Sequence, residues 1–161
     1  MGMKTLLLVA LLASSICATA QTAPAPFKGA NIILIQTPDS ANVALKKMAS
    51  AFVVSGFMPE KLDTELHSLT TQPKTFGKTT PAVFAYKVMA RRTPGGGTTL
   101  EITGDCTVQV GLQPVVSSMQ WYKGTPTQQN KVCFNEAEKA AKAYLGGVVK
   151  YTVSTMSAVK Q

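Results

Sequence analysis

The chain has little of what catalytic and metal-binding proteins usually need. Its 161 residues include one histidine, His67, and three cysteines, and 8 acidic side chains stand against 16 basic ones. His67 shares a predicted strand face with Asp63 and Glu65, but neither a second histidine nor a cysteine stands at ligand spacing. We interpret this cluster as a solvated face and predict no metal, no cofactor and no catalysis. Nucleophile motifs, nucleotide fingerprints and calcium loops are also missing.

The sequence also lacks a long hydrophobic run. A membrane-spanning helix needs about 20 apolar residues, whereas the run from Leu6 to Leu12 is much shorter. It follows the basic Lys4 and precedes Ala18-Thr19-Ala20. A short basic start, a short apolar stretch and an Ala-x-Ala site are typical of a secretory signal peptide. We therefore predict that residues 1–20 are removed and that the protein is periplasmic or extracellular, without a transmembrane span.

Lipid attachment at Cys17 is the alternative to simple cleavage after Ala20. The residue before a lipidated cysteine is normally small, and here it is the branched Ile16. We favour cleavage that makes Gln21 the new N-terminus, and keep lipidation as the alternative.

The excess of positive charge limits the choice of partners. Removal of residues 1–20 takes away Lys4 and no acid, which leaves a net charge near +7. Such a charge favours anionic envelope components such as lipid headgroups or lipopolysaccharide. We predict no nucleic-acid partner, because an exported protein rarely meets one and the basic residues are scattered. An ordinary solvated basic surface is the alternative.

Two cysteines remain after cleavage, Cys106 and Cys133. An oxidising compartment permits a disulfide between them, and we predict one. The alternative is two separate buried thiols, because cysteine also packs as a small hydrophobe.

The strongest structural signal lies between Ala82 and Val110. Apolar and polar residues alternate along two arms, which predicts a hairpin of two half-buried strands. The arms are joined by Thr-Pro-Gly-Gly-Gly at residues 93–97, a typical turn sequence. Gly104 within the second arm suggests a bulge.

Other patterns predict the elements around this hairpin. The segments are a strand over 30–36, a helix from Thr37 to Gly56, strands over 61–71 and 115–122, and a helix from Asn135. Thr37 and Pro38 suit a helix start, and Asn135 to Glu138 resembles a capping box. Gly56 is expected in the left-handed conformation, with Phe57 folding back onto the last turn.

The order β-α-β-β-β-β-α predicts an α+β fold, an antiparallel sheet of four to five strands with two helices on one face. Residues 30–150 form the single domain, 21–29 a flexible Pro/Ala leader, and 151–161 a C-terminal strand or frayed tail. The other face of the sheet is expected to be polar, carrying Asp63, Glu65, His67, Lys87, Arg91, Glu101 and Thr103.

The candidate interaction surface combines residues of that polar face with the hairpin tip and an aromatic pair. Arg91 and Arg92 flank the glycine-rich turn, where guanidinium groups and open backbone amides suit a phosphate or carboxylate; a solvated tip is the alternative. Trp121 and Tyr122 suit a sugar or a partner, or are divided between core and rim. The candidate surface comprises Arg91, Arg92, Lys87, His67, Trp121 and Tyr122.

Gly56-Phe57, Asp63 and Leu69-Thr70-Thr71, placed after a strand and a helix, give the chain a likeness to a known group. They resemble small domains of Gram-negative envelope lipoproteins, such as the C subunit of the outer-membrane β-barrel assembly machine. The resemblance covers about 40 residues and rests mostly on element order. It implies a helix-grip fold and a role in envelope contacts, and it transfers no functional residue.

The leading hypothesis is a small exported, non-catalytic protein that binds another envelope protein through its polar sheet face or hairpin tip. The alternative is a periplasmic carrier or sensor of a small anionic or lipidic ligand. A carrier needs an internal cavity between helices and sheet, lined by Met48, Phe52, Tyr86 and Tyr144.

Overall fold

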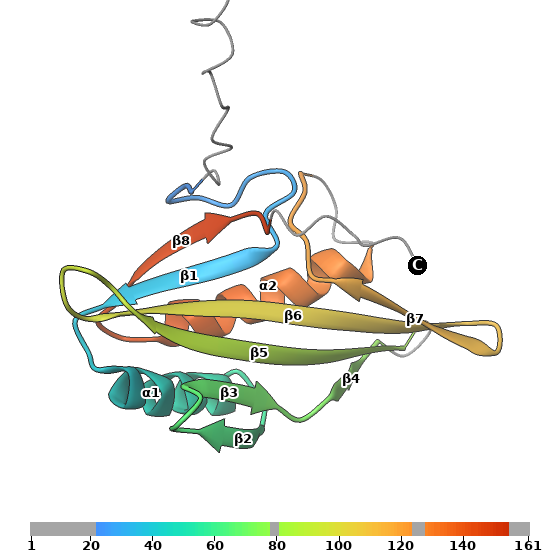
Figure 1. Cartoon of the computed structure of the whole chain (residues 1–161). Coiled ribbons are helices and arrows are strands. Elements are labelled where there is room, and N and C mark those ends of the chain that lie inside the picture. The colour runs from blue at the N-terminus through green and yellow to red at the C-terminus, as the bar shows by residue number, and fades with distance from the viewer. Residues whose placement is uncertain (1–21, 78–80, 124–127, 155–161) are drawn as a thin grey trace, which may run out of the picture.

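The computed structural model describes residues 22–77, 81–123 and 128–154. In these ranges the chain is an α+β protein, with two helices packed against an open antiparallel sheet of eight strands (Figure 1). The helices are α1 (Ala41–Val54) and α2 (Gln129–Ala143). The strands are β1 (Ile32–Thr37), β2 (Pro59–Asp63), β3 (Ser68–Thr71), β4 (Lys74–Phe76), β5 (Ala82–Arg92), β6 (Thr98–Val110), β7 (Gln113–Ser118) and β8 (Val148–Thr152).

The sheet is wider than predicted. Its order is β2-β3-β5-β6-β1-β8, with β4 also pairing with β5 and β7 also pairing with β6. The expectation of four to five strands is therefore wrong. The long strands β5 and β6 each accommodate two shorter neighbours end to end along one edge, which the alternation pattern of a single segment does not reveal.

The central hairpin is confirmed. Strands β5 and β6 pair without interruption from Ala82 opposite Val108 to Arg92 opposite Thr98. The predicted bulge at Gly104 is wrong, since Gly104 pairs in register with Tyr86. Glycine is needed there for space, because a Cβ atom would lie 2.7 Å from the Tyr86 ring.

Tyr86 also shows how the two helices meet the sheet. Its ring stacks on Phe52 of α1 with centroids 5.5 Å apart. Its hydroxyl donates to the Cys133 carbonyl oxygen of α2 at 2.8 Å. Both helices therefore contact the face that carries Tyr86, and this face holds the core.

Helix α1 ends as the sequence predicts and begins later. Gly56 has a φ of 81°, and the Phe57 N–H donates to the Phe52 carbonyl oxygen. Phe57 is fully buried, so the fold-back of this residue is confirmed. The helix starts at Ala41 with Ser40 as N-cap, not at Thr37. Thr37 instead completes β1 and is buried.

The single strand predicted over residues 61–71 is wrong. The segment is a hairpin of β2 and β3, because the Asp63 carboxylate accepts the N–H groups of Glu65 and Leu66 and closes a turn. His67 leaves this turn with a φ of 48°. Glu65 and His67 therefore belong to the turn and not to the sheet face with Lys87.

Helix α2 begins at Gln129, six residues before the predicted start at Asn135. Cys133 and Phe134 are fully buried on it and extend the stripe of Ala137 and Ala140 backwards by one turn. The resemblance of Asn135 to Glu138 to a capping box was misleading, because the buried stripe decides where the helix lies. Strand β7 likewise ends at Ser118, and Trp121 lies beyond it.

The segment before β1 makes specific contacts. Ala23 bridges to Tyr151 of β8 through two backbone hydrogen bonds, and Gly29 donates to the Trp121 carbonyl oxygen. Phe27 is partly buried against the core. Strand β8 spans the predicted boundary at residue 150. The predicted signal peptide with its predicted cleavage site, Cys17, and residues 155–161 of the predicted tail lie outside the described residues.

The predicted disulfide is not formed in this structure. Cys106 and Cys133 are both buried free thiols, which is the alternative that the sequence left open. Burial raises the pKa of the Cys133 thiol to about 12, and burial also raises the pKa of Cys106. Neither thiol is activated as a nucleophile in this environment.

Candidate functional site

The turn between β5 and β6 is fixed against the loop that joins β1 to α1. Within the turn, the Thr93 hydroxyl donates to the Gly96 carbonyl oxygen, and Gly96 N–H donates to the Thr93 carbonyl oxygen. The Thr98 hydroxyl then reaches the Asp39 carbonyl oxygen at 2.8 Å. Two chain segments about sixty residues apart are thereby joined at one end of the sheet.

Gly97 makes this close approach sterically feasible. Its φ is 80°, and a Cβ atom there would lie 2.5 Å from the Thr37 carbonyl oxygen. A side chain would therefore collide with backbone, which cannot move aside as a flexible side chain can. Glycine at this position is a requirement of both the turn and the contact.

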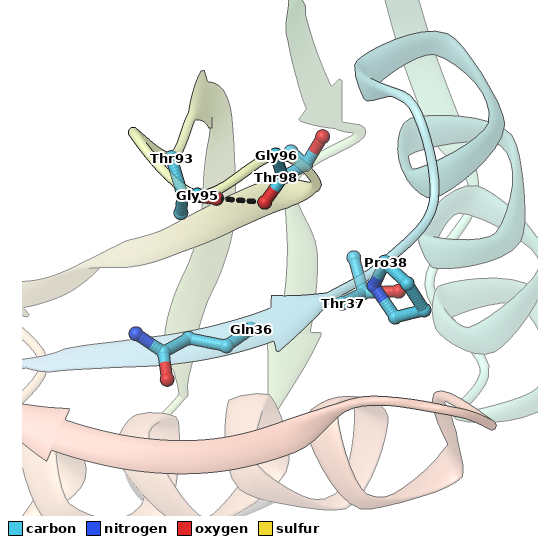
Figure 2. Close-up of a pocket in the computed structure, with 7 residues that line it drawn as sticks. All are labelled: Gln36, Thr37, Pro38, Thr93, Gly95, Gly96 and Thr98. Carbon is cyan, nitrogen blue, oxygen red and sulfur yellow. Dashed lines mark hydrogen bonds between the residues drawn. The ribbon is translucent and has the colours of Figure 1, made fainter.

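Two adjoining hollows are lined by the turn and share Pro38, Thr93, Gly96 and Thr98. The first, of about 390 Å³, lies between the turn and the end of β1 (Figure 2). Its lining residues are Gln36, Thr37, Pro38, Thr93, Gly95, Gly96 and Thr98. The second, of about 430 Å³, extends to the start of α1 and adds Asp39, Ser40, Ala41, Arg92, Pro94 and Gly97. We call the two hollows together the hairpin-end site.

The lining of the hairpin-end site includes one acidic and one basic side chain, Asp39 and Arg92. The Asp39 carboxylate is already engaged, since Lys47 Nζ lies 2.7 Å away and the Tyr144 hydroxyl 2.9 Å away. These two hydrogen bonds hold the pKa of Asp39 below its ordinary value. Arg92 is exposed, and no described carboxylate forms an ion pair with it. The site is therefore cationic on balance.

The face of the sheet opposite Tyr86, which we call the open face, differs from the hairpin-end site because it carries charges of both signs. Arg91 pairs with Glu101 across the strands at 3.4 Å. A hollow of about 260 Å³ lies further along this face, and Lys87, Asp105 and Glu60 are among its lining residues. Charges of both signs here largely compensate one another, so this face has weak selectivity for an ion of either sign.

The six residues of the candidate interaction surface do not form one surface. Arg91 and Lys87 point to the open face, whereas Arg92 lines the hairpin-end site. The His67 carbonyl oxygen accepts the Ala90 N–H, which places His67 near the same end of β5. The sequence singled out Arg92, which lines the hairpin-end site, but it missed the segment from Gln36 to Ala41.

Trp121 and Tyr122 lie apart from the arginines, next to α2. Lys131 Nζ stands 5.8 Å from the Trp121 ring centroid and 5.1 Å from that of Tyr122. Trp121 packs against the core, and its backbone N–H donates to the Ala30 carbonyl oxygen. Both rings are half-buried, so neither presents an open stacking surface.

The side chains that a carrier cavity would need are used for packing. Phe52 and Tyr86 stack on each other, and Met48 is fully buried. The Tyr144 hydroxyl is bonded to Asp39 and Thr37. None of these four side chains lines the hairpin-end site.

The described residues contain no group of three potential metal ligands. Within the same ranges, neither helix has the length and apolar character needed to cross a bilayer.

Replacing Tyr144 by phenylalanine is expected to raise the pKa of Asp39 towards the ordinary carboxyl value, because one of its hydrogen bonds is lost. A lowered pKa in the folded state stabilises the protein above the unfolded-state pKa, and this contribution disappears as the pH falls through the folded-state pKa. Acid unfolding should therefore begin at higher pH in the variant. Carboxyl-carbon NMR titration measures the shift, and an unchanged pKa of Asp39 would contradict the assigned hydrogen bond.

Replacing Arg91 and Arg92 together by alanine is expected to change the free energy of unfolding by less than about 1 kcal/mol, because exposed ion pairs contribute little. Arg91 is exposed where it pairs with Glu101. Urea denaturation measures the difference, and a loss of several kcal/mol would show that these side chains support the fold.

No protein-family model matches the chain, and no curated protein matches it with a significant score.

Proposed function

We propose that this chain is a small exported, non-catalytic protein of a Gram-negative envelope that acts by binding. The hairpin-end site is its contact with an acidic segment of another envelope protein. The observation that carries the proposal is the cationic balance of this site, where no carboxylate of the described residues pairs with Arg92 while Asp39 is neutralised by Lys47.

The rigidity of the site supports a binding role. The Thr98 hydroxyl and the close approach of Gly97 hold the turn against the β1–α1 loop. A fixed surface loses little conformational entropy when a partner binds. In addition, Ser40 makes no side-chain cap bond at the start of α1. Since Ser40 and Ala41 line the second hollow, the N–H groups of the first helical turn lie near it. Such groups and a guanidinium both favour carboxylates.

The signal-peptide pattern and the resemblance to envelope lipoprotein domains support the location. Other observations support a non-catalytic role: burial raises the pKa of both buried thiols, and the acid of the site, Asp39, is engaged in hydrogen bonds that lower its pKa. The expected partner surface is acidic, and its binding should weaken as salt is added.

Charge reversal at Arg92 tests this function. The wild-type protein, extracted gently from the envelope of its own host and examined by native mass spectrometry, should carry a co-migrating chain whose mass differs from its own. Arg92→Glu should lose that chain. Lys28→Glu makes the same change in net charge at an exposed position before β1 and should retain it. Equal retention in both variants, or a wild-type protein that is always alone, would contradict the proposal.

A further inference from the structure

The hairpin of β6 and β7 exposes uncharged and apolar residues, whereas the hairpin-end site is cationic. It projects beyond the body of the molecule at the other end of β6 (Figure 1). Leu112 at its tip is 98% exposed, and Val116 is 63% exposed. The sequence from Thr107 to Tyr122 contains no charged residue, although the whole chain has a net charge of +8.

The hydrogen-bond pattern shows which backbone groups of β7 point away from β6. Met119 N–H donates inward to the Gly104 carbonyl oxygen, and Gln120 N–H donates outward to the Asn130 carbonyl oxygen of α2. Along an antiparallel strand, the backbone N–H and C=O groups of successive residues point alternately towards one neighbouring strand and away from it. The register of β6 and β7 is continuous, so the backbone groups of even-numbered β7 residues point away from β6. Val116 and Ser118 therefore offer N–H groups at the edge, while Pro114 offers a carbonyl oxygen alone.

The other edges of the sheet are protected against pairing. Strand β2 carries Glu60, Lys61 and Asp63 and has an irregular register. Strand β8 is bridged by Ala23, and β4 has three residues that begin with Lys74. Charges, irregularities and covering segments are the usual means by which proteins protect sheet edges. Strand β7 has Pro114 but no charge and no cover in the described structure.

We propose that β7 is a dimer interface, at which two copies of this chain pair their β7 strands antiparallel about a two-fold axis at Val116. In this register Val116 N–H donates to the Val116 carbonyl oxygen of the second copy. Ser118 N–H donates to the Pro114 carbonyl oxygen of the second copy. Both outward donors of each copy are satisfied. The Ser118 carbonyl oxygen has no strand donor opposite it, because Pro114 of the second copy lacks an N–H.

A second copy fits this edge better than a charged partner does. Each outward donor of the edge meets an acceptor of the same edge in a second copy, as a two-fold interface requires. Its lack of charge offers nothing to an ionic partner but allows two basic molecules to approach. Since both copies are positively charged, dimerisation should strengthen as salt screens their repulsion. The acidic contact at the hairpin-end site has the opposite salt dependence, so the two proposals are separable.

Sedimentation velocity of the purified chain over a range of concentrations, at low and high salt, tests the dimer. A monomer–dimer equilibrium that shifts towards dimer at high salt is expected. Val116→Pro removes an outward N–H without removing a bond to β6, and it should weaken dimerisation roughly ten- to hundred-fold. Val116→Lys should also weaken it by placing like charges on the axis. Val54→Lys, at an 80% exposed position of α1, should not.

Cross-linking provides a second readout that does not depend on fold stability. Directly opposed residues in a hydrogen-bonded antiparallel pair have Cα atoms about 5.5 Å apart, which suits a disulfide. Val116→Cys should therefore form a covalent dimer on oxidation, whereas Val54→Cys should not. A chain that stays monomeric at all concentrations, larger open-ended assemblies, or a dimer unaffected by Val116→Lys would overturn the proposal.

Discussion

Replacing Gly97 by alanine is expected to lower the free energy of unfolding by about 3 kcal/mol. The left-handed φ of this residue costs alanine about 1–2 kcal/mol, and overlap with the Thr37 carbonyl oxygen adds about 1–3 kcal/mol. The turn must move away from the β1–α1 loop to relieve the overlap. Binding at the hairpin-end site should weaken for the same reason. Urea denaturation measures the loss of stability.

Gly96 is the matched control. It also has a positive φ, of 85°, but no atom lies within 4 Å of its Cβ position. Gly96→Ala should therefore cost only the conformational contribution of about 1–2 kcal/mol. If both variants lose the same stability, the contact between the turn and the β1–α1 loop contributes nothing.

Replacing Tyr86 by alanine is expected to lower the free energy of unfolding by about 3–5 kcal/mol, as for other buried aromatic side chains. Its ring contacts Phe52 and Phe57 and fills the space over Gly104. Removal leaves a cavity at the point where both helices meet the sheet. Thermal and urea unfolding both measure the effect.

Tyr86→Phe separates the ring from the hydroxyl. This change keeps the ring and removes the bond to the Cys133 carbonyl oxygen, so a loss of about 1 kcal/mol is expected. A Tyr86→Ala variant that is as stable as Tyr86→Phe would mean that the ring does not connect the helices to the sheet.

The sequence predicted the elements whose signals are local. The hairpin from Ala82 to Val110 follows from strict alternation, and the end of α1 follows from Gly56 and Phe57, because each signal lies within a few residues. The α+β class followed from the order of these elements. The start of α2 was placed incorrectly because a polar capping pattern was given more weight than the buried Cys133 and Phe134.

The candidate site was predictable only in part. Arg92 and the glycine-rich turn stood out, but the β1–α1 loop that forms the other wall lies about sixty residues earlier in the chain. Pairing across that separation depends on which strand lies next to β6, and single-segment patterns contain no such information. The prediction of a single strand over 61–71 was wrong for a related reason. The turn depends on hydrogen bonds to the Asp63 side chain, and the alternating sequence around it does not indicate a turn.

Site-specific photo-cross-linking in the intact producing cells tests the proposed function most directly. A photoreactive residue at Pro94, exposed at the tip of the turn, is compared with one at Val54 on α1. The proposed function predicts one discrete adduct with an envelope protein from position 94, lost with Arg92→Glu and absent from position 54. Equal adducts from both positions, or an adduct from position 94 that survives Arg92→Glu, would contradict a binding role for the hairpin-end site.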